Sequence, residues 1–299
     1  MKKNGVPYGE ARRLAYFVVI CKNLLSSGPV NVDFLIDRLL LYAKKLNPKL
    51  KEHVRKTGIM QSRAVARNYL SFCNRLRFLE LEGRLAVPNG YTVFVGNLGE
   101  CENFSLTPKE KIGLFLRLVD FNEFVKLLSS LKEKNWVKDH VKPDLSEHFV
   151  ETFFEWFVDL GIVKPSSQRF GVFFLTSLGD HVKEACKQYK DKFEISRIFA
   201  SYVLDAPIKR DLDISDIDFW KQFTPSFKRL SQYTRSEIDP NLYSALPAIL
   251  DLQVNLILNF KQLSSIERLI EKLKNISMGY DAIFSWDPLV GAGYIKLHG

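Results

Sequence analysis

The stretch MQSRAVARNYLSFCNRLRFL, residues 60–79, decides the fold of the first third of the chain. Its apolar residues recur at the spacing of one face of an α-helix, and they are Val65, Tyr69, Phe72, Leu76 and Leu79. Polar residues gather on the opposite face, and they are Arg63, Arg67, Asn74 and, beside them, Ser71. This pattern predicts an amphipathic helix with one buried face and one polar face.

The segments before this stretch are also expected to be helical. Apolar residues recur at helical spacing over residues 9–26, and Asn31 fits the N-cap of a second helix that ends near Ala43. Asn47-Pro48 predicts the start of a short basic helix that ends near Lys56, because proline is favoured at the first position of a helix. The first 79 residues are therefore expected to be mainly α-helical.

Two short β-prone runs follow these helices, at residues 84–87 and 91–95. They flank Pro88-Asn89-Gly90, which is a strong hairpin signal. Helices followed by a hairpin resemble the winged helix-turn-helix superfamily over residues 8–97. The resemblance implies that the helix of residues 60–79 is a recognition helix, and that the hairpin is a wing with Arg84 near a phosphate.

The positive charge of the chain is concentrated in its first third. The 299 residues include 43 Lys and Arg against 34 Asp and Glu, which gives a net charge of +9. Residues 1–97 hold 17 Lys and Arg and 6 Asp and Glu, a net charge of +11, whereas residues 98–190 and 191–299 each hold 13 and 14. A basic unit joined to two nearly neutral ones indicates an anionic partner for the first unit.

The candidate nucleic-acid-binding residues form two groups. Arginine and asparagine can make bidentate contacts with base edges in a major groove, so Arg63, Arg67 and Asn74 are expected to read sequence, flanked by Ser71. A second group precedes the predicted recognition helix and is expected to contact phosphates without reading sequence. This basic cluster comprises Lys44, Lys45, Lys49, Lys51, Arg55 and Lys56. A solvated polar face is the alternative interpretation of the helix pattern.

The middle third repeats this plan. Thr107-Pro108-Lys109-Glu110 is a capping box at the start of a helix. A later helix is predicted to start near Asp144 and to stop at Gly161, and a hairpin is predicted over residues 162–176 around Pro165-Ser166-Ser167. Helices followed by a hairpin again resemble a winged helix, so the sequence predicts two winged-helix units in tandem.

The helix in the recognition position of this second unit has the opposite charge. Acidic residues recur on it every fourth residue and form a carboxylate stripe of Glu147, Glu151, Glu155 and Asp159. We expect the stripe to repel phosphates and to be either a solvated face or a binding surface for a basic protein partner. A metal site is not expected, because no acid is correctly spaced with His148.

The expected fold class is mainly α with short β-hairpins. Tandem winged-helix units at residues 1–97 and 98–190 are followed by a mostly helical C-terminal domain at residues 191–299. In that domain a helix is predicted from Asp239-Pro240, another begins at Ser264 or Ser265, and residues 280–297 are a candidate third hairpin.

The sequence contains none of the patterns that mark common enzymes. It lacks a Walker motif, HExxH and GxSxG, and its histidines and cysteines do not occur at metal-binding spacing, so no catalytic residue, metal or cofactor is expected. It also has no run of about 18 uncharged apolar residues that would cross a membrane. Isolated thiols suit a reducing compartment, which favours a cytoplasmic location.

The leading hypothesis is a DNA-binding transcriptional regulator. Its first domain would contact duplex DNA, and the other two would serve for homodimerisation or partner binding. Two alternatives remain open. One is a replication initiator in which both winged-helix units contact DNA. The other is an interaction subunit of a larger DNA-handling complex, in which the carboxylate stripe is the main binding site.

Overall fold

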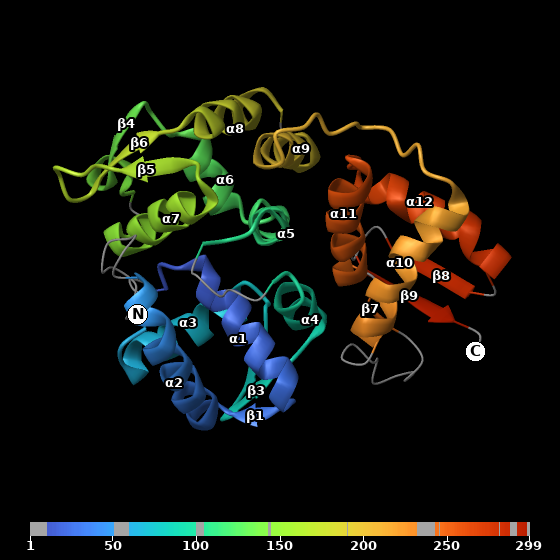
Figure 1. The fold of residues 1–299 in the computed structure, drawn as a ribbon, viewed down its shortest axis with the longest axis horizontal. Helices are drawn as coiled ribbons and strands as arrows, with labels where there is room; N and C mark the ends of the chain where they lie inside the picture. The colour runs from blue at the N-terminus through green and yellow to red at the C-terminus, as the bar shows by residue number, and fades with distance from the viewer. Residues whose placement is uncertain are drawn as a thin grey trace.

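The computed structural model describes residues 11–50, 60–99, 105–142, 145–189, 191–231, 243–244, 246–280, 282–287 and 292–297. The described chain is mainly helical, and its strands form small antiparallel sheets of three strands each. Figure 1 shows three units, which we call the N-terminal unit (residues 14–96), the middle unit (122–175) and the C-terminal unit (216–297). This composition agrees with the expected mainly α fold with short hairpins.

The N-terminal unit begins with three helices and contains one sheet. Its elements are α1 (Leu14–Ser27), β1 (Val30–Asn31), α2 (Val32–Leu50), α3 (Arg63–Arg75), β2 (Glu80–Glu82), β3 (Leu85–Val87) and α4 (Gly90–Gly96). In the sheet β3 lies between β1 and β2. Gly83, in the turn between β2 and β3, has a φ of 59°, a conformation that glycine adopts without steric cost.

The middle unit has the same kind of sheet. Its elements are α6 (Asn122–Ser129), β4 (Lys134–Trp136), a 3-10 helix η1 (Val137–His140), α7 (Glu147–Leu160), β5 (Val163–Pro165) and β6 (Val172–Leu175). The last strand, β6, pairs with both β4 and β5. The predicted stop of α7 is confirmed, because Gly161 adopts a left-handed conformation with φ 83° and ψ 12°.

Three helices connect the units. They are α5 (Pro108–Leu118), α8 (Ser177–Gln188) and α9 (Lys192–Val203). The predicted capping box of α5 is confirmed: Thr107 Oγ1 accepts the Glu110 N–H at 3.3 Å, and the Thr107 N–H donates to Glu110 Oε2 at 2.6 Å. Thr176 caps α8, because its hydroxyl accepts the Gly179 N–H at 3.1 Å.

The C-terminal unit contains a third sheet, which confirms the candidate hairpin. Its elements are α10 (Asp216–Ser231), β7 (Tyr243–Ser244), α11 (Leu246–Phe260), α12 (Ile266–Ser277), a 3-10 helix η2 (Met278–Tyr280), β8 (Ala282–Asp287) and β9 (Ala292–Leu297). Ser265 is the N-cap of α12, as predicted, whereas Asp239-Pro240 lies outside the described residues.

The three units share one order of elements. In each, a helix is followed by a strand, at least two helical segments and two strands, and the last strand lies in the centre of the sheet between the other two. In the middle unit the helical segment after the first strand is the 3-10 helix η1, and in the C-terminal unit the 3-10 helix η2 follows α12. Within the described residues, this strand topology therefore occurs in each of the three units.

Two local predictions in the N-terminal unit are wrong. Residues 90–96 form α4 and not a strand, because Asn89 accepts the Thr92 N–H at 3.1 Å and Thr92 Oγ1 accepts the Asn89 N–H at 2.8 Å. The hairpin instead joins 80–82 to 85–87. In addition, α2 continues to Leu50, so no new helix begins at Asn47-Pro48.

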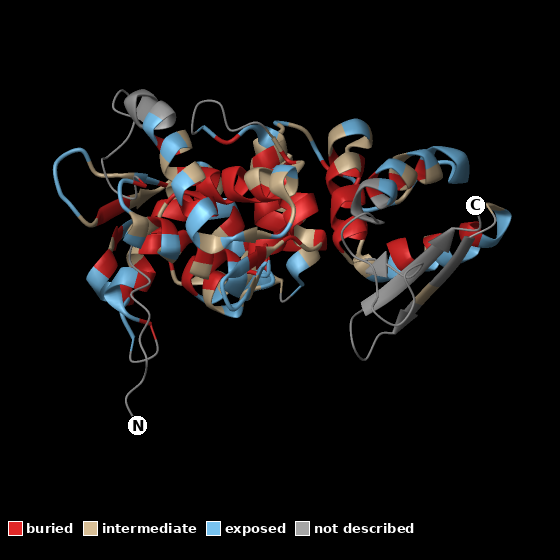
Figure 2. Ribbon diagram, turned by 90° about the horizontal axis from the view of Figure 1, so that it is seen from below, coloured by how far each residue is buried: buried red, intermediate tan, exposed pale blue. Residues whose placement is uncertain are grey.

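The N-terminal and middle units share a hydrophobic core. The indole of Trp156 on α7 lies edge-on to the rings of Phe17 at 5.5 Å and Phe72 at 5.6 Å between ring centroids. The same core reaches α11 through Val254, while Val93 of α4 packs into the core of the C-terminal unit. Figure 2 shows buried segments across the left-hand part of the molecule and also in α11, which can be found from its place in Figure 1. The units are therefore packed against one another and not joined only by linkers.

Among the described residues, no helix combines the length and the apolar character that crossing a bilayer would require.

Replacing Trp156 with Ala is expected to destabilise the whole chain. The side chain is fully buried and fills the contact between two units, so its loss leaves a cavity that costs about 3–5 kcal/mol. Thermal unfolding followed by circular dichroism would measure the change. Met278→Ala is the control, because Met278 is 82% exposed and its loss is expected to leave the midpoint nearly unchanged. Equal midpoints for the two variants would contradict the central role of Trp156.

Candidate nucleic-acid interface

Helix α3 has the two faces that its sequence predicts. Ser62 caps it by accepting the Val65 N–H at 3.3 Å, and Tyr69, Phe72 and Leu76 are buried. The opposite face, with Arg67 and Asn74, is exposed. The candidate recognition helix therefore presents a polar surface to solvent.

The two arginines on this surface are paired with carboxylates of α2. Arg63 contacts Asp33 at 2.8 Å and also Asp37, and Arg67 contacts Asp33 at 3.0 Å. Hydrogen bonds from Arg63 and Arg67 lower the pKa of Asp33 below its ordinary value. Asp33 and Asp37 therefore compete with bases for the two arginines. The periodicity of the sequence did not reveal this competition.

The other predicted base-reading residues have different environments. The Asn74 side-chain oxygen accepts the Leu81 N–H at 3.2 Å, so Asn74 fixes the start of β2 and its acceptor is not free to read an adenine. Ser71 is half-buried. Arg84 is exposed in the turn between β2 and β3, although the strand beside it carries the exposed acids Glu80 and Glu82. Around the turn of the hairpin, one exposed cation would therefore face a phosphate together with two exposed acids, which would oppose its attraction.

The basic cluster can be placed only in part. Lys44 is exposed on α2. The side chains of the other members, Lys45, Lys49, Lys51, Arg55 and Lys56, lie outside the described part of the chain. Their expected contacts with phosphates remain a prediction.

The carboxylate stripe is not a surface for a separate partner, because the chain itself covers it. Arg12 contacts Glu151 at 2.7 Å, and Arg13 contacts Glu155 at 3.3 Å and Asp159 at 2.9 Å. These two arginines immediately precede α1, and the Leu14 N–H also donates to Asp159 at 2.8 Å. Only the fourth member, Glu147, is exposed. The basic partner that the stripe predicts is the N-terminal unit.

The Arg13 contact is deeply buried. Its side chain is 3% exposed, and those of Glu155 and Asp159 are 5% and 8% exposed. Burial opposes the charged guanidinium, but the two carboxylates outweigh it and raise the pKa of Arg13. Burial also raises the pKa of Asp159, against the attraction of Arg13. Arg13 therefore stays charged and compensates the two buried acids.

Helix α7 is consequently unavailable to a groove of DNA. Besides the arginine contacts, Trp156 Nε1 donates to the Ala11 carbonyl at 2.8 Å, and the Phe149 ring stacks on Phe72 at 6.2 Å. The side of α7 that carries Glu151, Glu155 and Asp159 is thus covered by the N-terminal unit. The middle unit cannot contact DNA through this helix in the way expected of a recognition helix.

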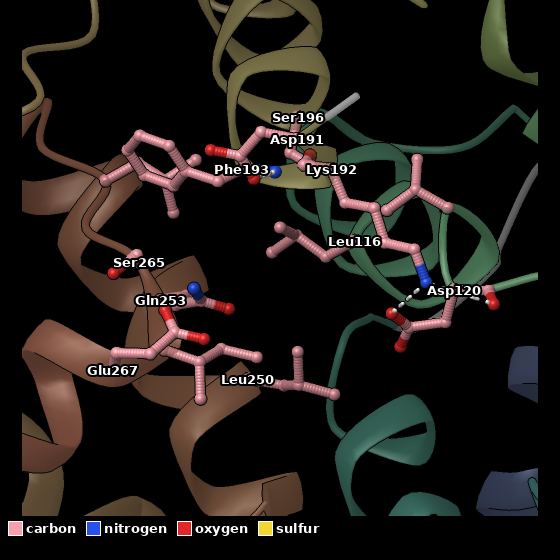
Figure 3. A pocket seen from close by; sticks show the side chains of 13 residues that line it. Leu116, Asp120, Asp191, Lys192, Phe193, Ser196, Leu250, Gln253, Ser265 and Glu267 are labelled. Carbon is pink, nitrogen blue, oxygen red and sulfur yellow. Dashed lines mark hydrogen bonds and ion pairs between the residues drawn. The ribbon is translucent and has the colours of Figure 1, made fainter. Parts of the chain in front are cut away.

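A cavity of about 340 Å³ lies between α5, α9, α11 and α12. Figure 3 shows Asp120, Asp191 and Glu267 on its walls, with Lys192 reaching Asp120. Lys192 Nζ is 3.5 Å from Asp120 Oδ1 and 3.3 Å from its carbonyl oxygen. One lysine against three acids makes this cavity unsuited to phosphate groups.

One buried titratable group of the middle unit is His140. Burial lowers the pKa of His140, whose ring nitrogens hydrogen-bond Asn135 and Ser130 at 3.1 and 3.2 Å, so this histidine is part of the packed middle unit. Within the described ranges, no three His, Cys, Asp or Glu side chains are placed to hold a metal ion.

Replacing Arg13 with Ala is expected to cost about 3–5 kcal/mol of stability, because it leaves two buried carboxylates without their cation. Urea unfolding of the full chain would measure the loss. Arg12→Ala is the matched control, since the Arg12–Glu151 contact is more exposed and its removal is expected to cost less. A loss for Arg12→Ala as large as that for Arg13→Ala would refute this account of the buried pair.

Comparison of the chain with models of known protein families, with curated proteins and with solved structures finds no match in any of the three.

Proposed function

We propose that this protein is a non-catalytic DNA-binding protein, with a role in transcriptional regulation, that contacts duplex DNA through its N-terminal unit. The observation that carries the proposal is the exposed polar face of α3, which belongs to the most basic third of the chain. The proposal is supported by the helices α1, α2 and α3 and the hairpin of β2 and β3 in this unit, because the winged-helix resemblance rests on helices followed by a hairpin. The α3 surface would enter the major groove.

Electrostatics would supply most of the affinity. Of the 17 cations in residues 1–97, Arg12, Arg13 and Arg75 pair with acids of the middle unit, which leaves 14 against the 6 acids of residues 1–97. Three exposed cations of the described part of this unit are Lys44 on α2, Arg67 on α3 and Arg84 in the turn between β2 and β3. Contacts of this kind neutralise phosphates and release counterions, so they give binding that falls steeply with salt.

Asp33 and Asp37 would tune this binding. They hold the Arg63 and Arg67 side chains beside α2 in the free protein, and they also place negative charge where phosphates would approach. Binding would then require the arginines to exchange a carboxylate for a phosphate or a base. Because this exchange offsets part of the binding free energy, we expect a modest affinity for duplex DNA. The affinity would depend on the DNA sequence only where a base edge takes the place of Asp33.

The two alternatives from the sequence have less support. An interaction subunit that uses the carboxylate stripe would need that stripe exposed, whereas Arg12 and Arg13 cover most of it. A replication initiator that inserts both α3 and α7 into DNA would need α7 exposed, whereas its outer side packs on the N-terminal unit.

Removing both arginines, as Arg63→Ala with Arg67→Ala, is expected to weaken duplex binding about tenfold or more and to reduce the salt slope. Fluorescence anisotropy of a random-sequence duplex across a salt series would measure both. Lys187→Ala with Arg268→Ala is the control, because it removes two exposed cations far along the chain from α3. Equal affinities of the two double variants would exclude α3 as the DNA-contacting surface.

Removing the competing acids, as Asp33→Asn with Asp37→Asn, is expected to tighten duplex binding several-fold, because it releases the arginines and removes two negative charges. The same anisotropy assay applies. Glu267→Gln with Glu271→Gln removes two exposed acids from α12 and is expected to have a smaller effect. Weaker binding by the Asp33 and Asp37 variant would show that these acids position the arginines productively, contrary to the proposed competition.

A further inference from the structure

A cluster of cations surrounds one aromatic ring on the middle unit. The indole of Trp136 has Lys138 Nζ at 5.3 Å, Lys134 Nζ at 5.5 Å and the Arg169 guanidinium carbon at 5.9 Å from its centroid. The three cationic residues are exposed, and Trp136 is half-buried. Cations near an aromatic face are attracted by its quadrupole, which explains how three like charges are held together.

The fold of the middle sheet brings these residues to one place. Lys134 and Trp136 are two residues apart on β4, so their side chains lie on the same face of the sheet. Lys164 of β5 belongs to the same face, because both it and Lys134 pair with Phe174 in the register. Arg169 comes from the β5–β6 loop, where the Ser166 hydroxyl accepts the N–H groups of Gln168 and Arg169 at 3.2 Å each.

The segments that form and flank this face carry an excess of positive charge. Six exposed cations lie on β4, η1, β5 and the segments next to them, and they are Lys132, Lys134, Lys138, Lys142, Lys164 and Arg169. Only two exposed acids, Glu133 and Asp139, occur in the same segments, which leaves an excess of four positive charges. The net charge of −1 for residues 98–190 concealed this patch, because the acids of the carboxylate stripe lie on α7.

An exposed aromatic residue extends the patch. Phe170, next to Arg169 at the tip of the β5–β6 loop, is 70% exposed. Exposure of a phenyl ring costs free energy, and within a cationic surface it suits a ligand that carries both negative charge and flat apolar faces. Unpaired nucleotides have this combination, since their phosphates are anionic and their bases are uncovered. In a duplex the base faces are covered by stacking.

We propose that the patch of Lys134, Trp136, Lys138, Arg169 and Phe170 binds single-stranded nucleic acid, with the cations on phosphates and Phe170 stacked on a base. This site lies on the middle unit and is separate from α3, so it goes beyond the proposed duplex contact and does not depend on it. The protein would then contact a duplex and an unpaired strand through different units.

The test is fluorescence anisotropy of labelled 15-nucleotide oligo-dT and oligo-U on the full-length chain across a salt series. Lys134→Ala with Lys138→Ala and Arg169→Ala is expected to weaken binding at least tenfold and to reduce the log–log salt slope by about 2, since each phosphate contact on a single strand contributes about 0.7. Phe170→Ala is expected to weaken binding about tenfold with an unchanged slope, because stacking releases no counterions.

Two controls make the result specific. Lys187→Ala with Arg268→Ala and Lys274→Ala removes the same charge from exposed positions on α8 and α12 and is expected to retain binding. Arg63→Ala with Arg67→Ala is expected to retain oligo-dT binding, so that failure of the duplex proposal and failure of this one are seen separately. Unchanged thermal midpoints would show that each variant is folded.

Three outcomes would overturn the proposal. One is oligonucleotide affinity of the patch variant equal to that of its charge-matched control. Another is full affinity in Phe170→Ala, which would leave a phosphate surface without base stacking. The third is displacement of the oligonucleotide by polyglutamate at equal charge concentration, which would identify an acidic protein as the occupant. Stronger binding of oligo-dT or of oligo-U would support the proposal and assign it to DNA or to RNA.

Discussion

The guanidinium of Arg13 lies between the carboxylates of Glu155 and Asp159, and the packing of the N-terminal unit on the middle unit depends on this contact. Neither acid could be buried at the contact without a cation, because an isolated buried charge is strongly disfavoured. Once the charges are compensated, Trp156 can enter the core between Phe17 and Phe72. The same contact decides which surfaces remain for ligands, since it covers α7 and leaves α3 exposed.

The local elements could be predicted from sequence wherever a cap and an apolar period agree. The Thr107–Glu110 capping box, the Gly161 stop and the polar and apolar faces of α3 all follow from residue type and spacing. Asn89-Gly90 shows the limit of such signals, because the same asparagine serves a hairpin turn or an N-cap. Here the asparagine is an N-cap, because the side chain of Thr92 completes the capping box. Residues 92–96 are also buried, which favours the helix.

The candidate site was less predictable, because charge patterns do not show what faces them. Residues at every fourth position give the same stripe whether it meets water, another protein or the chain itself, and here Arg12 and Arg13 meet it 140 residues or so away in sequence. The pairing of Arg63 and Arg67 with Asp33 is likewise a tertiary contact between two helices. The cations around Trp136 come from three separate segments, and only the sheet register brings them together.

The shared core of the N-terminal and middle units affects how the two proposed nucleic-acid contacts, at α3 and at the Trp136 patch, would combine in one binding event. Both α3 and the Trp136 patch belong to units that are packed on one hydrophobic core and not tethered by a flexible linker. When one surface holds a nucleic acid, the other meets the adjoining strand at an effective concentration set by this fixed geometry, without the entropy loss of ordering a linker. Avidity would therefore discriminate between nucleic acids by shape. A junction whose duplex and free strand match the spacing of the two surfaces would gain affinity from both contacts. A nucleic acid of any other geometry would gain affinity from only one.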